Sequence, residues 1–251
     1  MGIRLHRTRP GAFLRAVCIW ASVISVSVHG QTFHTLSPGK EAAIGGIGLG
    51  FHGLGAWKAG KYPVDHVPRI DLANVPMIDR VATRQWSVPA HRTSNVLFGL
   101  AVGASLAVSI ADQHGEQPLL PVVILAESAL LCSGITNTVK EFVGRPRPYL
   151  YNPDVPQSAY HGHADNVSFW SGHTANTAAI TFACAGMVQR SDASKGMKTA
   201  TWIGAAVTPA AMGYLRVKAG KHFPTDVLTG YAVGALVGWA VPYFHRTKEQ
   251  P

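Results

Sequence analysis

The run PLLPVVILAESALLCSGITNTV occupies residues 118–139, and the side chain of Glu127 is its only charged group. This length is close to the roughly 20 apolar residues that a helix needs to cross a bilayer. A similar run, SNVLFGLAVGASLAVSIAD, precedes it at residues 94–112, and the polar segment 112–117 (DQHGEQ) joins the two. We therefore predict two membrane-spanning helices connected by a tight turn.

Three further apolar segments, rich in alanine and glycine, follow at residues 174–189, 199–215 and 226–244. Small residues allow helices to approach one another closely inside a bilayer. Charged residues make up only 14% of the chain, against roughly 25% in soluble domains. Buried helices of a soluble protein are the alternative, but 251 residues are too few to cover so many. The predicted fold class is all-α, a membrane-embedded bundle of about five to six transmembrane helices.

The first 30 residues have the layout of an export signal, because four arginines precede an apolar run at 16–28. A cleaved signal peptide and an uncleaved signal anchor remain alternatives, and in both the following chain is exported. The Gly-rich segment 41–60 is expected to be non-spanning or re-entrant, and 61–92 to be a polar surface connection. The predicted divisions are the signal, the exported segment, a core with three motifs and a cytoplasmic tail, at 1–30, 31–92, 93–245 and 246–251.

The distribution of basic residues predicts the orientation. The loop 189–198 and the C-terminal tail are both basic, and such short segments stay in the cytoplasm. Residues 140–172 and 216–225 are then at the outer face of a bacterial-type inner membrane, towards the periplasm or the exterior. The net charge of +9 lacks the basic and aromatic interleaving of a nucleic-acid groove, so no nucleic-acid partner is predicted.

Three polar clusters border these helices: KEFVGRPRP (140–148), SFWSGHT (168–174) and RVKAGKHFPTD (216–226). In the first, the Gly-Arg-Pro-Arg-Pro run breaks a helix, so that Lys140 and Arg147 can meet at the membrane surface. An ammonium and a forked guanidinium both suit phosphate oxygens. Contact with lipid headgroups is the alternative explanation for these two cations.

In the second cluster, Ser171 is a plausible N-cap of a helix whose N-terminus can hold an anion. Gly172 allows a ligand to come close to the backbone, and His173 lies in the first helical turn. A structural role is the alternative for a single histidine at such a place.

In the third cluster, Pro224 suits the first turn of a helix, which leaves His222 just outside it and Asp226 within it. The carboxylate can then reach one imidazole nitrogen and leave the other as a nucleophile. Arg216 supplies a third cation. Helix capping alone is the alternative for the His222–Asp226 pair.

In this order, the patterns Lys-x6-Arg-Pro, Ser-Gly-His and Arg-x5-His-x3-Asp resemble the type-2 phosphatidic acid phosphatase superfamily, which also contains soluble bacterial acid phosphatases and vanadium haloperoxidases. The resemblance covers residues 94–245, with the motifs on about thirty positions. It implies that phosphate is bound by cations and backbone-proximal donors at Lys140, Arg147, Ser171, Gly172 and Arg216.

The resemblance also implies three catalytic roles. His222 attacks phosphorus, Asp226 orients it, and His173 protonates the leaving oxygen. No metal ion or other cofactor is expected to take part.

This sequence departs from the family pattern at two positions. Trp170 stands where the family usually has proline, and Leu215 where serine is common. Neither change removes a catalytic group, although Trp170 could alter the rigidity of the loop or the mouth of the pocket.

Two further features lie outside the motifs. His161, His163 and Asp165 form a His-x-His-x-Asp pattern, for which a flexible lid is favoured over a metal site. Glu127 lies inside an apolar run, where an ionisable group often pairs internally. A structural partner on a neighbouring helix is expected for it, and the sequence does not identify that partner.

The predicted function is hydrolysis of phosphate from a lipid or isoprenoid (di)phosphate through a phosphohistidine, with the bilayer and the amphiphilic substrate as partners. A vanadium haloperoxidase is disfavoured because those enzymes are soluble and much longer. A soluble secreted acid phosphatase and a non-catalytic membrane protein that binds phosphate or lipid are the remaining alternatives.

Overall fold

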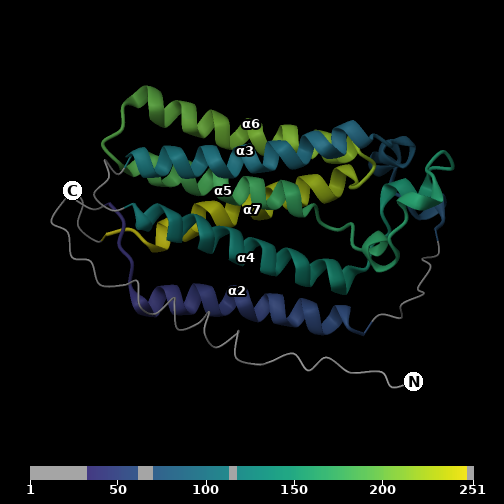
Figure 1. Cartoon of the computed structure of the whole chain (residues 1–251), viewed down its shortest axis with the longest axis horizontal. Helices are drawn as coiled ribbons and strands as arrows, with labels where there is room; N and C mark the ends of the chain where they lie inside the picture. Colours follow the sequence, from purple (N-terminus) through teal and green to yellow (C-terminus); the bar gives the residue numbers. More distant parts are fainter. Residues whose placement is uncertain (1–32, 62–69, 113–117, 248–251) are drawn as a thin grey trace, which may run out of the picture.

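The computed structural model describes residues 33–61, 70–112 and 118–247, and within them every α-helix and 3₁₀ helix belongs to one all-α bundle (Figure 1). The α-helices are α2 (Pro38–Ala59), α3 (Val88–Asp112), α4 (Leu119–Val143), α5 (Gly172–Arg190), α6 (Lys195–Lys218) and α7 (Pro224–Phe244). The 3₁₀ helices are η1 (Leu72–Asn74), η2 (Met77–Arg84), η3 (Pro148–Tyr151), η4 (Gln157–Ala159) and η5 (Gly162–Asn166). The all-α prediction is confirmed.

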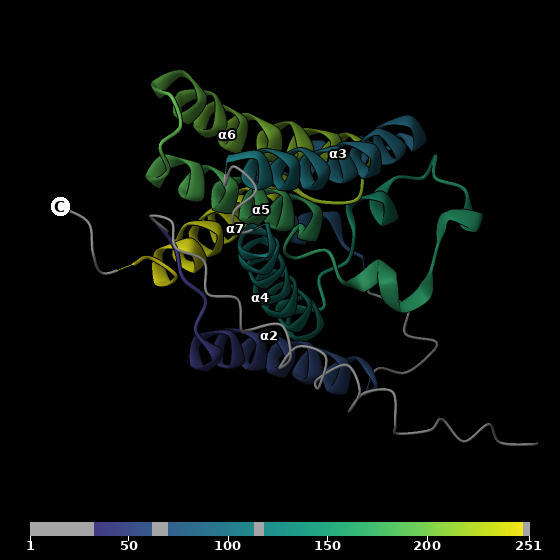
Figure 2. The same ribbon diagram turned by 60° about the vertical axis from the view of Figure 1, so that its left-hand side comes forward.

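Helix α5 lies at the centre of the bundle and packs against α3, α4, α6 and α7. Figure 2 shows α2 set apart from α3 and α6, on the far side of α4. The main core cluster joins buried apolar side chains of α4, α5 and α7, among them Ile124, Met187 and Val241. The contact between α5 and α7 is close because Gly234 faces α5: a Cβ built there would lie 2.0 Å from the carbonyl oxygen of Ala175.

The helices leave large apolar side chains exposed. Leu100 on α3, Val207 on α6 and Leu236 on α7 are 64%, 59% and 63% exposed. Among the described residues, three segments are long and apolar enough to cross a membrane, namely Val88–Asp112, Leu119–Tyr151 and Pro224–Phe244. Together with the exposed apolar side chains, these segments indicate a helical membrane protein, since soluble proteins seldom expose broad apolar patches.

For segment 41–60, predicted to be non-spanning or re-entrant, the structure excludes the re-entrant alternative, and α2 is not among the segments named above as apolar enough to span. Helix α2 continues without a break for 22 residues, so it is not a re-entrant hairpin. It runs parallel to α4, because Gly48 faces Leu130 and Gly55 faces Thr138 further along both helices. The described part of the predicted surface connection 61–92 contains η1, η2 and the first turn of α3. The predicted export signal at 1–30 lies outside the described residues.

The two ends of the bundle bring different segments together. At one end His34 forms a β-bridge with Arg246, and Ser191 donates a hydrogen bond to Asp112. At the other end η2 and the loops after α4 and α6 meet, since Arg145 contacts Asp79 and the amide of Tyr149 donates to the carbonyl of Gly220. This second end holds all three sequence motifs.

Candidate active site

The first motif follows the end of α4. Gly144 terminates the helix with a φ of 60°, and its amide donates to the carbonyl of Lys140. The ammonium of Lys140 reaches across to the loop before α5, where it donates to the carbonyl oxygen of Val167 at 2.6 Å. Lys140, in the last turn of α4, is therefore held against the second motif.

Arg147 is fixed by three hydrogen bonds to loop backbone. Its amide donates to the carbonyl of Asp165, Nε donates to Ala164 at 2.7 Å, and Nη1 donates to the carbonyl of Lys221 at 3.0 Å. Within the described residues, Nη2 makes no hydrogen bond. The guanidinium is thus oriented by the protein, with one nitrogen left to bind a ligand.

The second motif begins α5. Ser171 is the N-cap, and its hydroxyl accepts a hydrogen bond from the amide of Thr174, as predicted. Its own amide donates to the carbonyl of Asp226 at 3.0 Å, so that amide is not available to an anion. Gly172 is the first residue of the helix, where backbone donors have no partner within the helix. A Cβ at Gly172 would lie 3.7 Å from Cε of Lys140, which places this helix start beside the lysine.

His173 faces α3, since its Nε2 lies 3.0 Å from Oδ1 of Asn95. The amide oxygen can only accept, so Nε2 carries the proton of this hydrogen bond. The ring of Phe98 lies against the imidazole, with the centroids 5.7 Å apart. Asn95 is a positioning residue that the motifs do not include.

Arg216 lies near the end of α6 and is 4% exposed. Its Nη1 lies 3.0 Å from Nδ1 of His91 and 3.1 Å from Oγ of Ser94. Its Nε is buried with no hydrogen-bond partner among the described residues. The start of α3 therefore orients both Arg216 and His173, which the sequence did not indicate, since His91, Ser94 and Asn95 belong to none of the three clusters.

His222 follows the turn at Gly220, whose φ of 70° favours glycine. A Cβ at Gly220 would lie 2.2 Å from the carbonyl oxygen of Gln85. The imidazole is 2% exposed, and its Nδ1 lies 2.8 Å from the carbonyl oxygen of Ser168. A carbonyl only accepts, so Nδ1 is the protonated nitrogen and Nε2 keeps its lone pair. Nε2 makes no hydrogen bond with the described part of the chain.

Asp226 acts on His222 less directly than predicted. Its Oδ2 lies 3.6 Å from Nδ1 of His222, which is an ion-pair distance but too long for a hydrogen bond. That oxygen instead accepts from the hydroxyl of Ser168 at 2.5 Å and from the amide of Phe223 at 2.9 Å. Asp226 thus orients the residue whose carbonyl orients the imidazole.

A buried network that sequence reasoning missed supports Asp226. Arg145 donates from Nη1 to Oδ1 of Asp226 at 2.5 Å and from Nη2 to Oδ2 of Asp79 at 2.8 Å. Asp79 also accepts from the amide and the hydroxyl of Thr225, at 2.9 and 2.7 Å. Both carboxylates are fully buried. Hydrogen bonds to charged groups of this kind are the strong ones, and they fix the start of α7 against η2 and the first motif.

Positive charge concentrates around His222. Burial, and then Lys140, Arg147 and Arg216, hold the pKa of His222 well below its ordinary value of 6.5. Burial, and then Arg147 and Arg216, lower the pKa of Lys221 to about 8. Like charges that suppress one another's protonation form a site that favours an anion. Lys221 is the fourth cation here, and the motif pattern did not single it out.

The His-x-His-x-Asp residues do not form a common ligand set. The carboxylate of Asp165 accepts from the hydroxyl of Tyr149 and from the amide of His161. His163 pairs instead with Glu141, at 2.8 Å. This loop also accepts hydrogen bonds from Arg147 at the carbonyls of Ala164 and Asp165, so it packs against that cation.

Trp170 is buried within the loop before α5. Its indole nitrogen donates to the hydroxyl of Thr136 at 2.8 Å, and the side chain is 8% exposed. The tryptophan thus attaches the loop to α4 through a buried hydrogen bond.

Comparisons with known proteins identify the family of the chain. Residues 121–250 match the model of the PAP2 superfamily. Among solved structures, the chain is similar to the "first transmembrane PAP2 type phosphatidylglycerolphosphate phosphatase from Bacillus subtilis", with 21% identity, 92% of both chains covered and a TM-score of 0.44. No curated protein matches the sequence.

Proposed function

The chain belongs to the PAP2 superfamily, and on that premise we propose that it is a membrane phosphatase for a lipid or isoprenoid (di)phosphate, acting through a phosphohistidine. The observation that carries the proposal is the neutral His222, whose Nδ1–H is bound to Ser168 while Nε2 is free. This nucleophile lies among three cations, Lys140, Arg147 and Arg216, and the fourth cation, Lys221, interacts with the two arginines.

The proposed reaction has two steps. Nε2 of His222 bonds to phosphorus as the bond to the leaving oxygen breaks, and His173 supplies the proton that the leaving oxygen takes up. Water then attacks the phosphohistidine and gives a proton to His173 as the N–P bond breaks, so that inorganic phosphate leaves and both histidines return to their starting state. Such transfers depend mostly on positioning and electrostatic stabilisation, which the oriented cations and the N-terminus of α5 supply.

The surroundings of His222 also suit the charge that the first step creates. When Nε2 bonds to phosphorus, the imidazole becomes cationic. The carbonyl of Ser168 lies 2.8 Å from Nδ1 and the carboxylate of Asp226 lies 3.6 Å from it, so both stabilise that cation. Since Arg145 and Asp79 hold Asp226 in place, this stabilisation needs no rearrangement during the reaction.

An amphiphilic substrate is supported by where the site lies. It stands at one end of the helices, whose sides expose apolar side chains such as Leu100 and Leu236. A substrate whose tail stays in the bilayer can bring its headgroup to this end without leaving the membrane. The phosphatase core is proposed as 93–245, and η2 together with residues 88–92 supports it from the preceding segment.

We further propose that α2, α5 and α6 cross the membrane in addition to the three candidate spans in α3, α4 and α7, with the site at the outer surface of a bacterial-type inner membrane. The basic loop 189–198 and the tail mark the cytoplasmic end. Because His34 bridges to Arg246, α2 also begins at that end. In this orientation the chain enters α2 from the cytoplasm. The segment that directly follows the arginine-rich N-terminus would then be cytoplasmic rather than exported.

The test is phosphate release by detergent-purified protein from phosphatidic acid, an isoprenyl diphosphate and a soluble phosphoester, with EDTA present. Release from a lipid that vanadate blocks and that His222→Ala abolishes is the expected result. Equal release from the soluble ester, with protein lost from membranes in high salt, would instead identify a soluble acid phosphatase. Binding of vanadate without turnover of any substrate would identify a non-catalytic phosphate-binding protein.

A further inference from the structure

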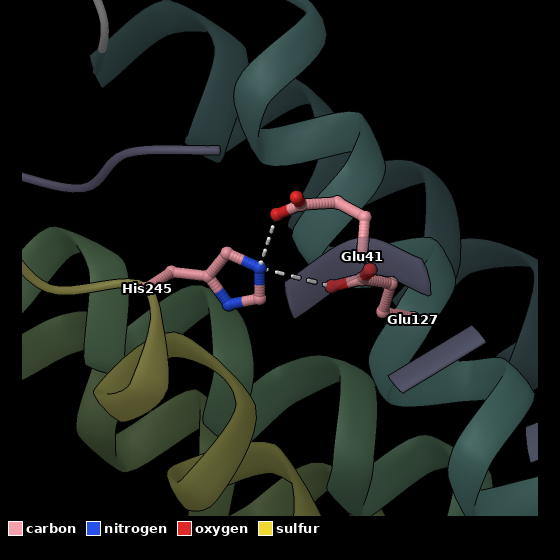
Figure 3. A group of neighbouring side chains, drawn as sticks. All are labelled: Glu41, Glu127 and His245. Carbon is pink, nitrogen blue, oxygen red and sulfur yellow. Dashed lines mark hydrogen bonds and ion pairs between the residues drawn. The ribbon is translucent and has the colours of Figure 1, made fainter. Parts of the chain in front are cut away.

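Three ionisable side chains converge at the end of the bundle opposite the phosphate site. Glu41 comes from the first turn of α2, Glu127 from α4, and His245 from the residue after α7 (Figure 3). The two glutamates are 5% and 0% exposed, and the histidine is 0% exposed. Glu127 lies 13 positions before Lys140 on the same helix, about 20 Å along its axis. This cluster is therefore separate from the proposed reaction centre.

A single imidazole nitrogen faces both carboxylates. Nε2 of His245 lies 3.0 Å from Oε1 of Glu41 and 3.1 Å from Oε2 of Glu127 (Figure 3). The other nitrogen, Nδ1, lies 2.8 Å from the carbonyl oxygen of Val241, to which it donates its proton. In a neutral ring Nε2 is then an acceptor that faces two further acceptors. A cation between the three atoms would remove this conflict.

Glu127 gives a second, independent indication of a ligand. Its Oε1 is buried with no hydrogen-bond or ion-pair partner among the described residues, and Oε2 faces only Nε2 of His245. A buried carboxylate oxygen without a partner is costly. The other glutamate is better satisfied, since its Oε2 accepts from the amide of Ser37 at 2.7 Å while Oε1 faces the histidine. One oxygen of each carboxylate and one nitrogen are thus directed at the same point.

From this geometry we propose that Glu41, Glu127 and His245 bind a divalent transition-metal ion, with zinc as the best fit. Zinc takes imidazole nitrogen and carboxylate oxygen at about 2.0–2.2 Å, so the ligand atoms of a tetrahedral site lie about 3.3–3.6 Å apart. The two separations from Nε2, 3.0 and 3.1 Å, are a few tenths of an ångström shorter, so the side chains need to open only slightly around the ion. A divalent ion also balances two carboxylates beside a neutral imidazole. The hydrogen bond from Nδ1 to a carbonyl is the second interaction that metal-binding histidines usually make.

The metal would fasten three segments that are far apart in the sequence. Glu41 and His245 are 204 positions apart, and Lys40 also donates to the carbonyl of Phe244 at 2.8 Å. Helix α2 packs mainly on α4, at the edge of the bundle. Its first turn is thus attached both to α4 and to the end of α7. The site is structural, and the proposed phosphoryl transfer does not involve it.

The test is the metal content and thermal stability of full-length protein purified in detergent without a polyhistidine tag. After loading with zinc chloride and removal of excess metal, about one zinc per chain is expected by mass spectrometry. EDTA should lower Tm by several degrees, and zinc should restore it. Glu127→Gln and His245→Gln should each lose the bound zinc and the response of Tm to zinc.

The matched control is His52→Gln, which removes a different polar contact between α2 and α4, the 3.0 Å contact of His52 with Ser133. This variant should keep the zinc. Wild-type protein that retains no zinc after loading, with the same Tm in zinc and in EDTA, would overturn the proposal and identify a protonated His245 shared by two glutamates. Zinc retained equally by Glu127→Gln and His245→Gln would place the metal elsewhere and also overturn it. Because the first outcome needs only wild-type protein, the test holds even if a variant fails to fold.

Discussion

Arg145 and Arg147 are two positions apart in the sequence, yet their guanidinium groups serve different parts of the site. Arg145 is bound to the buried carboxylates of Asp226 and Asp79 at 2.5 and 2.8 Å. Arg147 is bound only to backbone carbonyls, and it helps to lower the pKa of His222 and Lys221. The first arginine therefore supports the structure of the site, and the second is available to a phosphate.

This division predicts opposite effects for two alanine variants. Arg145→Ala leaves two buried carboxylates without their cation, which should cost about 3 kcal/mol of folding free energy. Arg147→Ala should reduce kcat/KM by at least about a hundredfold while Tm changes little. Thermal unfolding and steady-state phosphate release on both variants measure this. Equal loss of Tm in the two variants would contradict the assignment.

Ser168 tests how His222 is oriented. The hydrogen bond to Nδ1 comes from the backbone carbonyl, which Ser168→Ala preserves, while the bond from Oγ to Asp226 is lost. We expect kcat to fall by about tenfold, the usual size of one hydrogen bond to a charged group. His222→Ala should abolish turnover. A complete loss in Ser168→Ala would show that the hydroxyl itself takes part in the reaction.

Lys221 makes anion binding depend on pH. Its pKa is lowered to about 8 in the free protein, so the ammonium is fully charged below pH 7 and loses its charge as the pH rises through 8. The inhibition constant of vanadate or phosphate should therefore rise through this range. Lys221→Arg should keep tight binding above pH 8, because a guanidinium stays protonated. An unchanged pH profile in this variant would assign the effect to another group.

His222 should make the fold less stable in acid. Its pKa is below 6.5 in the folded protein, so below pH 6.5 the unfolded state binds a proton that the folded state does not. Stability from this residue is present above pH 6.5 and declines as the pH falls. Between pH 7 and pH 5, Tm should fall less steeply in His222→Gln than in the wild type. Parallel curves would mean that the imidazole is protonated in the folded state.

The close contact between α5 and α7 depends on a glycine, which has no side chain, at position 234. A Cβ at Gly234 would lie 2.0 Å from a backbone oxygen of α5, so the helices must move apart in Gly234→Ala. Overpacking of this kind costs about 1–3 kcal/mol. Gly204→Ala on α6 is the control, since a Cβ there meets no atom within 4 Å. Thermal unfolding of the two variants should separate them, and equal Tm values would contradict the close packing.

Sequence patterns predicted most of the helices, but they did not predict which residues at the helix ends face the site. Residues 118–139 predicted α4 well, because an apolar run of this length is a local property of the chain. The start of α3 at Val88 rather than residue 94 was missed, since the polar residues of its first turns face the site rather than lipid. The Gly-rich run 41–60 did not reveal a continuous helix. Its glycines at Gly48 and Gly55 allow close packing against α4, and this role depends on a helix that is distant in the sequence.

The sequence by itself determined the all-α class and the three motifs, and the motifs are sufficient to identify the family. Such patterns are local, so spacing alone is enough to show them. Only the tertiary structure decided that Ser168 binds Nδ1 of His222, that Arg145 rather than Arg147 holds Asp226, and that Glu127 faces Glu41 and His245. These pairs join residues far apart in the chain, and only the packing of the helices determines which of several chemically suitable partners meet.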